Sequence, residues 1–149
     1  MTRYRERLSP GVGIWLAFAV LVPAVTLMFA PLSIWLGIAS AVVVYALAML
    51  VAVGTAPVLE VTDTELRAGR ARIDLALVGD TAAFRGSAAT EQRGPRLDAR
   101  AFRVMRGWVP GLVTVRIEDP ADPTPYWAIS TRHPERFARA IDEARAARG

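Results

Sequence analysis

Between Leu8 and Leu59 the chain carries no charged side chain. A run of 52 such residues in a chain of 149 is longer than the core of a small soluble domain accommodates. One helical membrane span needs about 20 apolar residues, so the run is long enough for two spans and a tight turn. The sequence therefore predicts a membrane anchor followed by a globular part.

The two spans are expected at about 11–30 and 32–53, with Pro31 opening the second helix. Pro23 lies inside the first span and should kink it, because proline removes a backbone hydrogen bond and clashes with the preceding turn. Small residues at helical spacing, such as Gly37, should let the helices approach closely. We expect packing within the hairpin, and an oligomer interface is the alternative.

The distribution of charge predicts the orientation of the spans. Arg3, Arg5 and Arg7 precede the first span, and the turn between the spans is uncharged. The positive-inside rule then places the N-terminus in the cytoplasm, and the second span returns the chain to that side. We expect a multi-pass protein of the plasma membrane with both termini in the cytoplasm. The predicted parts are a basic N-terminus at 1–10, two spans at 11–54 and a cytoplasmic domain at 57–149.

A cleaved signal peptide is the alternative interpretation of the first span. The sequence argues against it, because Met28 is bulky where a small residue is needed before a cleavage site and a second apolar span follows at once. No ionisable side chain lies within either span. Transport pathways and proton relays usually need such a group, so we do not expect a transporter.

From Pro57 onward the hydrophobic pattern changes to a period of two, which is typical of strands. Leu59 and Val61, for example, alternate with polar neighbours. Turn residues separate the successive strands, and the small, polar segment 86–95 should form a loop. The predicted strands are 58–62, 65–68, 70–75, 80–86, 101–108, 112–118 and 126–130.

The chain is expected to end in an amphipathic helix that begins at Pro134. Phe137, Ile141 and Ala144 recur at spacings of four and three, so they form one apolar stripe that should pack on a sheet of six or seven strands. The predicted fold class is an α+β membrane protein. It has an N-terminal transmembrane helical hairpin and a small antiparallel β-barrel or sheet closed by the C-terminal helix.

Meandering antiparallel strands closed by one helix resemble the pleckstrin-homology-like domain. The whole chain also resembles an uncharacterised actinobacterial two-span membrane family called domain of unknown function 3093. The segments that carry this resemblance are YRERLSP (4–10), GRARIDL (69–75) and DPADPTPYWAISTRHPERFARAI (119–141). The resemblance implies a topology, and it brings no activity and no catalytic residues.

The residue types needed for common catalytic and metal chemistry are scarce. The chain has no Cys and no Lys, and His133 is its one histidine. A thiolate nucleophile, a phosphate-loop lysine, a Schiff base and a transition-metal site are therefore not expected. Ser130 near His133 matches no nucleophile motif. A divalent metal at the acidic loop 118–122 is an open alternative, and turn formation is the favoured role for these residues. We expect no catalytic residue, no cofactor and no metal.

A surface for interaction is the kind of site that the sequence does support. All 18 basic residues are Arg, and the globular part is nearly balanced in charge, so a nucleic-acid partner is not expected. Tyr126 and Trp127 should face opposite ways on a strand, with one of them exposed. The candidate interaction surface comprises Arg67, Arg70, Arg72, Arg100, Arg103, Arg106, Tyr126, Trp127 and Arg132.

The expected function is that of a membrane-anchored, non-enzymatic binding or scaffold protein. Its partners would be the lipid bilayer and a membrane or cytoplasmic protein. The first alternative is recognition of anionic lipid headgroups by the arginines of the cytoplasmic domain, since basic residues near an anionic leaflet are attracted to it. A remote alternative is an enzyme of unrecognised type.

Overall fold

The computed structural model describes residues 1–148, which form two compact units. The helical hairpin comprises Ser9–Ala56. The globular unit combines Met1–Leu8 with the chain from Pro57 onward. The first eight residues, which the sequence suggests as part of a separate basic segment, thus belong to the globular unit.

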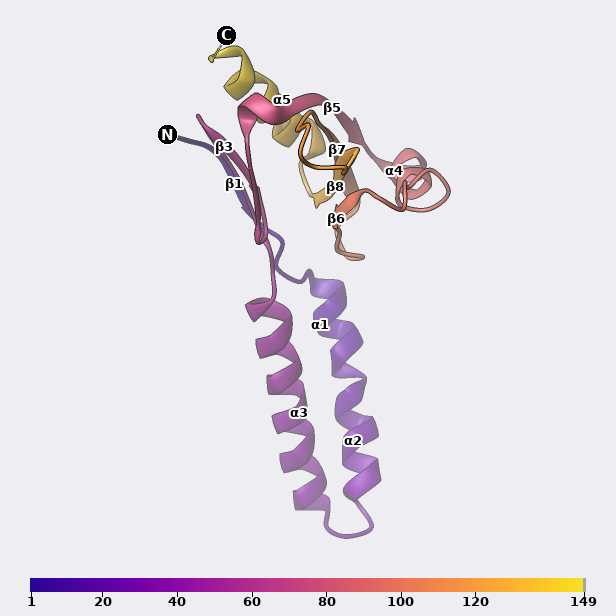
Figure 1. The fold of residues 1–149 in the computed structure, drawn as a ribbon. Coiled ribbons are helices and arrows are strands. Elements are labelled where there is room, and N and C mark those ends of the chain that lie inside the picture. Colours follow the sequence, from indigo (N-terminus) through magenta and orange to yellow (C-terminus); the bar gives the residue numbers. More distant parts are fainter. Residues whose placement is uncertain (149) are drawn as a thin grey trace. The chain divides into compact units, whose positions relative to one another are not determined.

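The helical hairpin contains α1 (Val12–Ala19), α2 (Leu21–Phe29) and α3 (Ile34–Gly54), and Figure 1 shows their order. The interruption at Val20 lies just before Pro23, whose ring leaves the carbonyl of Ala19 without its helical N–H partner. The helix is therefore interrupted within the turn that precedes Pro23, where the sequence predicts a kink.

The expectation that Pro31 opens the second helix is wrong. The backbone N–H groups of Leu32 and Ser33 both donate to the carbonyl of Phe29, at 3.0 and 3.1 Å. These hydrogen bonds close the turn that ends α2, and they place Pro31 inside that turn. The helix α3 then begins at Ile34, after the extended residue Ser33.

Close approach of α2 and α3 depends on Gly37. A Cβ atom at this position would lie 2.6 Å from the backbone oxygen of Thr26. The three buried residues of α3 are Gly37, Ala41 and Met49, and two of these are small. The predicted role of small residues in helix packing is confirmed at Gly37, whereas a Cβ at Gly13 would meet nothing within 4 Å.

The substitution Gly37→Ala is expected to destabilise the hairpin by about 1–3 kcal/mol, because the added methyl meets backbone that cannot rotate away. The measurement is unfolding of the purified chain in mixed micelles by a denaturing detergent, followed by far-UV circular dichroism. Gly13→Ala is the matched control and should be neutral or slightly stabilising, since alanine favours helix over glycine. Equal transitions for the two variants would refute the close helix contact.

The globular unit begins with a four-stranded antiparallel sheet, called sheet A here. Its strands are β1 (Thr2–Arg7), β2 (Val58–Thr62), β3 (Glu65–Ala68) and β4 (Ala71–Asp74), in the order β1-β2-β3-β4. The inward positions carry buried apolar side chains such as Leu59, Val61 and Leu66. The strand β1 is an addition to the predicted set, because the sequence analysis took these residues only as a basic flank.

A second four-stranded sheet, sheet B, has the order β5-β7-β8-β6. Its strands β5 (Val78–Phe84), β7 (Gly111–Ile117) and β8 (Tyr126–Thr131) are antiparallel, whereas β6 (Phe102–Val104) runs parallel to β8. The predicted loop at 86–95 is largely wrong, because α4 (Gly86–Arg93) occupies most of it. This helix buries only Ala89 and so shows no apolar stripe.

The two sheets do not form the closed barrel that was one form of the expected fold. The 3₁₀ turn η1 (Leu75–Leu77) separates β4 from β5, and the side chain of Asp74 caps it by accepting from the backbone N–H of Ala76. No strand pair joins the two sheets among the residues that the structure describes. The mixed α+β class is confirmed, in the form of two sheets.

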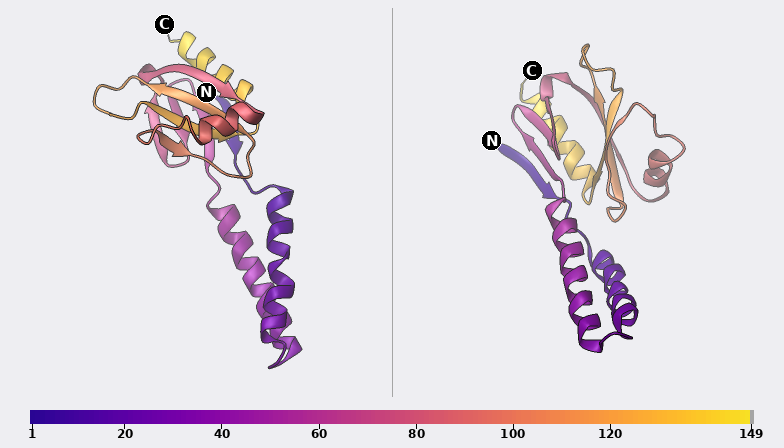
Figure 2. Two further views of the ribbon diagram at one scale, coloured as in Figure 1. Left: turned by 90° about the vertical axis from the view of Figure 1, so that its right-hand side faces the viewer. Right: turned by 60° about the horizontal axis from the view of Figure 1, so that its bottom comes forward.

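The C-terminal helix α5 (Pro134–Ala146) lies between the sheets and contacts β1 and β2 on one side and β5, β7 and β8 on the other (Figure 2). Phe137, Ile141 and Ala144 are fully buried, which confirms the predicted apolar stripe. One core cluster contains this stripe together with inward side chains of both sheets. The two sheets are thus joined by packing against α5, and not by strand pairing as in a closed barrel.

Candidate interaction surface

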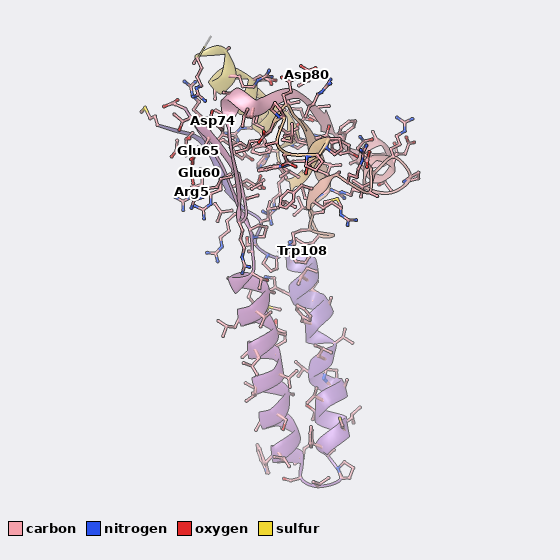
Figure 3. The ribbon with its side chains drawn as sticks, in the orientation of Figure 1. Arg5, Glu60, Glu65, Asp74, Asp80 and Trp108 are labelled. Carbon is pink, nitrogen blue, oxygen red and sulfur yellow. The ribbon has the colours of Figure 1, made fainter. Side chains whose placement is uncertain are left out.

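The outer face of sheet A carries a row of charged side chains across all four strands. Arg5 lies opposite Glu60, Glu60 opposite Arg67, and Arg67 opposite Arg72. Residues in register on adjacent strands point to the same face, so these four side chains form one row. Figure 3 shows Arg5 and Glu60 on the same side of the sheet.

Two more arginines lie at the end of the sheet where β1 ends and β2 begins. Arg7 pairs with Val58, and the backbone N–H of Gly69 donates to the carbonyl of Val58 at 2.8 Å. This hydrogen bond brings the β3–β4 turn, which contains Arg70, beside the start of β2. We call the five arginines of this region the basic face, and they are Arg5, Arg7, Arg67, Arg70 and Arg72.

The acidic residues at the opposite end of sheet A are Asp63, Glu65 and Asp74, and Asp74 forms an ion pair with Arg148. Glu65 pairs with Asp74, and Asp63 forms ion pairs with the N-terminal ammonium group and with Arg3. The hydrogen bonds from these two groups lower the pKa of Asp63. Charge is therefore unevenly distributed along the strands, with an excess of arginine where β1 ends and β2 begins. Figure 3 shows Arg5 nearer this end of the sheet than Glu65 and Asp74.

The arginines predicted at 100–106 belong to sheet B and its loops. Arg100 pairs with Asp98 at 3.5 Å, and a backbone hydrogen bond from Arg100 is the main cause of the lowered pKa of Asp98. The guanidinium of Arg106 lies 5.9 Å from the ring centroid of Trp108, in cation–π range. Arg103 is exposed on β6. The predicted arginines therefore divide between two sheets.

The aromatic pair of β8 has a structural role. Trp127 is only 5% exposed and its ring centroid lies 5.2 Å from that of Phe102, so its placement in the candidate surface is wrong. Tyr126 is half-buried. Its hydroxyl accepts a hydrogen bond from the backbone N–H of Asp98 at 2.8 Å, which fixes the loop before β6. Trp127 thus occupies the expected core position, whereas Tyr126 is half-buried and is not the exposed ring that was expected.

A buried polar cluster, which the sequence analysis missed, joins β1 to β8. The carboxylate of Glu6, 10% exposed, accepts from the hydroxyls of Tyr4 at 2.6 Å and Thr131 at 2.5 Å and from the backbone N–H of Arg132 at 3.0 Å. The guanidinium of Arg132 also lies 3.6 Å from Glu6 and donates to the carbonyl of Arg7 at 3.2 Å. Arg132 therefore fixes the end of β1 through its contacts with Glu6 and Arg7.

Burial raises the pKa of Tyr4 to about 12, and its hydrogen bond to Glu6 adds to this shift. A raised folded-state pKa means that the neutral phenol stabilises the fold below about pH 10, and that this contribution is lost as the pH rises toward 12. Wild type should therefore lose more stability than Tyr4→Phe between pH 10 and 12. Denaturant titrations of both proteins at each pH measure the difference. Parallel pH profiles would contradict the assignment.

The acidic residues of the loop before β8 have a local structural role. Asp119 and Asp122 accept from the backbone N–H groups of Ala121 and Thr124, both at 2.9 Å, as expected of turn residues. In residues 1–148 no group of three or more His, Cys, Asp and Glu is arranged to hold a metal ion.

An open depression of about 710 Å³ lies where α5 meets η1. It is lined by Leu75, Ala76, Val78, Glu118, Asp142, Arg145, Ala146 and Arg148.

The half-buried arginine Arg93 links α4 to the chain around the start of β7. Its guanidinium donates to the carbonyls of Val109 and Gly111 at 2.6 and 2.8 Å, and burial lowers its pKa. Ser130 is fully buried and accepts from the backbone N–H of Arg106 at 3.2 Å, whereas His133 is exposed at the start of α5. Arg93 is not among the residues of the predicted candidate surface.

Two apolar helical segments, two sheets and a C-terminal helix define a mixed α+β chain, and sheet A carries a candidate interaction surface. Residues 3–141 match the family described as "Protein of unknown function (DUF3093)", and the chain belongs to this family. The predicted family resemblance is confirmed. Comparison with the curated proteins and with the solved structures finds no match to this chain.

Proposed function

We propose that this chain is a membrane-anchored, non-enzymatic binding module whose globular unit acts at the cytoplasmic face of the plasma membrane. The observation that carries this proposal is the pairing of β1 with β2. The helical hairpin lies between these two strands in the sequence, so it is an insertion into the first connection of sheet A. The backbone N–H of Leu8 also donates to the carbonyl of Pro57 at 3.0 Å, which holds the two ends of the insertion together.

The composition and exposure of the hairpin support the anchor. Val12–Phe29 and Ile34–Gly54 are long and apolar enough to cross a membrane, and large apolar side chains along both are exposed. Soluble proteins rarely expose so much contiguous apolar surface. Trp15 stands near the start of α1 and Trp35 near the start of α3, so a spanning hairpin would place them at opposite interfaces, where tryptophan is favoured.

The same topology, together with the arginines before the hairpin, supports a cytoplasmic location of both termini. The paired strands β1 and β2 must lie on one side of any membrane that the hairpin crosses, because a sheet cannot span the bilayer between them. Arg3, Arg5 and Arg7 precede the hairpin, and positive charge favours the cytoplasmic side. An actinobacterial source and a pleckstrin-homology-like architecture belong to the same proposal. The all-arginine basic composition supports the first, and the C-terminal helix packed on antiparallel strands supports the second.

The anchoring part of the proposal is tested by washing membranes with alkaline carbonate. The full chain should remain in the membrane pellet, and its release into the supernatant would contradict a spanning hairpin. The binding part is tested by extraction in a mild detergent and affinity purification of the full chain. A stoichiometric protein or retained lipid supports a binding module, whereas a monomer without either contradicts it.

A further inference from the structure

We propose that the basic face binds anionic lipid headgroups of the leaflet from which the helical hairpin emerges. This inference rests on the proposed membrane anchor and names the ligand of the anchored module. Three observations carry it, namely the register of sheet A, the short chain segments between the basic face and the hairpin, and the uneven distribution of charge along the strands.

The register brings together arginines that are distant in the sequence. Arg5 and Arg7 come from β1, Arg67 from β3, Arg70 from the β3–β4 turn and Arg72 from β4. Arg67 is further positioned because its Nε donates to the carbonyl of Gly69 at 3.3 Å. A planar guanidinium binds phosphate oxygens in a forked geometry, so arginine suits a phosphate headgroup better than lysine does.

The length of the connecting chain keeps the basic face near the bilayer. Arg7 precedes the first residue of α1 by five positions, and Val58 follows the last residue of α3 by four. Five extended residues span at most about 18 Å, and screening in physiological salt acts over about 8 Å. The turn that contains Arg70 lies beside Val58 through the Gly69 hydrogen bond. These arginines therefore lie at the end of the sheet from which the chain enters the hairpin.

The uneven distribution of charge gives this end of the sheet an excess of positive charge. Glu60 is the one acidic residue in the four-residue row of Arg5, Arg67 and Arg72. The acidic residues Glu65 and Asp74 lie further along the strands, away from the hairpin ends. An anionic surface would therefore attract the end of sheet A nearest the hairpin more strongly than the far end, where ion pairs compensate the carboxylates.

The other arginines of the globular unit lack this arrangement. Arg100 pairs with Asp98, Arg106 stacks near Trp108, and Arg93 donates to backbone carbonyls. All three come from sheet B or its loops, which connect to the hairpin only through the rest of the unit. The arginines between positions 93 and 106 are therefore not part of this proposal.

The test measures lipid preference around the full chain reconstituted in phosphatidylcholine bilayers. Trace spin-labelled phosphatidylglycerol or phosphatidylcholine reports, by electron paramagnetic resonance, the fraction of each lipid immobilised by the protein. Wild type should prefer phosphatidylglycerol by about fivefold or more, since one arginine near an anionic lipid contributes about that factor. The preference should fall as salt is added.

The variant R5Q/R7Q/R70Q should lose most of this preference, and R5K/R7K/R70K should retain it because the charges are kept. The matched control R96Q/R100Q/R103Q removes the same charge from the other sheet and should keep the wild-type preference. An equal loss in the control, or no preference in wild type, overturns the inference. If neither label is immobilised by any protein, the proposed anchor itself has failed, so the two failures are distinguishable.

Discussion

The substitution Glu6→Ala is expected to lower the free energy of unfolding of the globular unit by about 3 kcal/mol. The change removes the acceptor of three hydrogen bonds and leaves Tyr4, Thr131 and the backbone N–H of Arg132 without it. Buried donors without a partner are costly, and Thr131 is fully buried. Denaturant titration of the chain in mild detergent, followed by near-UV circular dichroism, measures the effect.

Two variants show whether this loss comes from the buried cluster. Glu60→Ala removes a carboxylate from the outer face of the neighbouring strand and should change stability by less than about 1 kcal/mol. Glu6→Gln keeps the size of the side chain and should give an intermediate loss, because rotating hydroxyls can still pair with an amide. If Glu6→Ala and Glu60→Ala behave alike, the cluster does not hold β1 in place.

The substitution Phe137→Ala is expected to destabilise the globular unit by about 3–5 kcal/mol. Phe137 is fully buried on α5, and its ring centroid lies 5.1 Å from that of Tyr4 on β1. Its removal leaves a cavity where the helix meets sheet A and the shared core. Since domains of this size have about 5–15 kcal/mol of stability in total, the variant should be close to unfolding.

The neighbouring residue provides the control for this prediction. Arg136→Ala changes an exposed position of the same helix and should be nearly neutral. Thermal unfolding of both variants, followed by the near-UV signal of the globular unit, gives the comparison. A wild-type transition for Phe137→Ala would contradict the placement of α5 between the sheets.

Elements with a strong local pattern could be predicted from the sequence. Leu59 and Val61 alternate with polar neighbours, and β2 has the predicted bounds of 58–62. The stripe of Phe137 and Ile141 repeats at helical spacing, and α5 begins at the predicted Pro134. In each case one side of the element is buried and the other is solvated. The apolar residues therefore recur in the sequence with the period of the strand or the helix.

The strand β1 could not be predicted in the same way, because its inward positions are polar. Tyr4 and Glu6 face inward in place of aliphatic residues, and they hydrogen-bond to each other and to Thr131 and Arg132 at the end of β8. The alternation of arginines with Tyr4 and Glu6 is the one signal that could have revealed a strand. The strand that pairs with β1 is β2, which follows the whole helical hairpin in the sequence.

The candidate surface was therefore predicted only in part. Arg67 and Arg72 face outward together, as their alternation on β3 and β4 suggests. Arg5 and Arg7 were missing from the set because β1 was missing, and their contribution depends on a pairing between distant segments. Trp127 was included because a single strand does not show which of its faces the core covers.

The central claim is that the helical hairpin crosses the membrane as an insertion between β1 and β2. The chain has no cysteine, so single cysteines can be introduced without removing others. Labelling of intact cells with a membrane-impermeant maleimide should modify Leu32→Cys, in the turn between the helices. Thr2→Cys and Ala99→Cys should react only after the membrane is opened. Labelling of Thr2→Cys and Ala99→Cys from opposite sides of the membrane, or of Leu32→Cys from the same side as these two, would contradict the account.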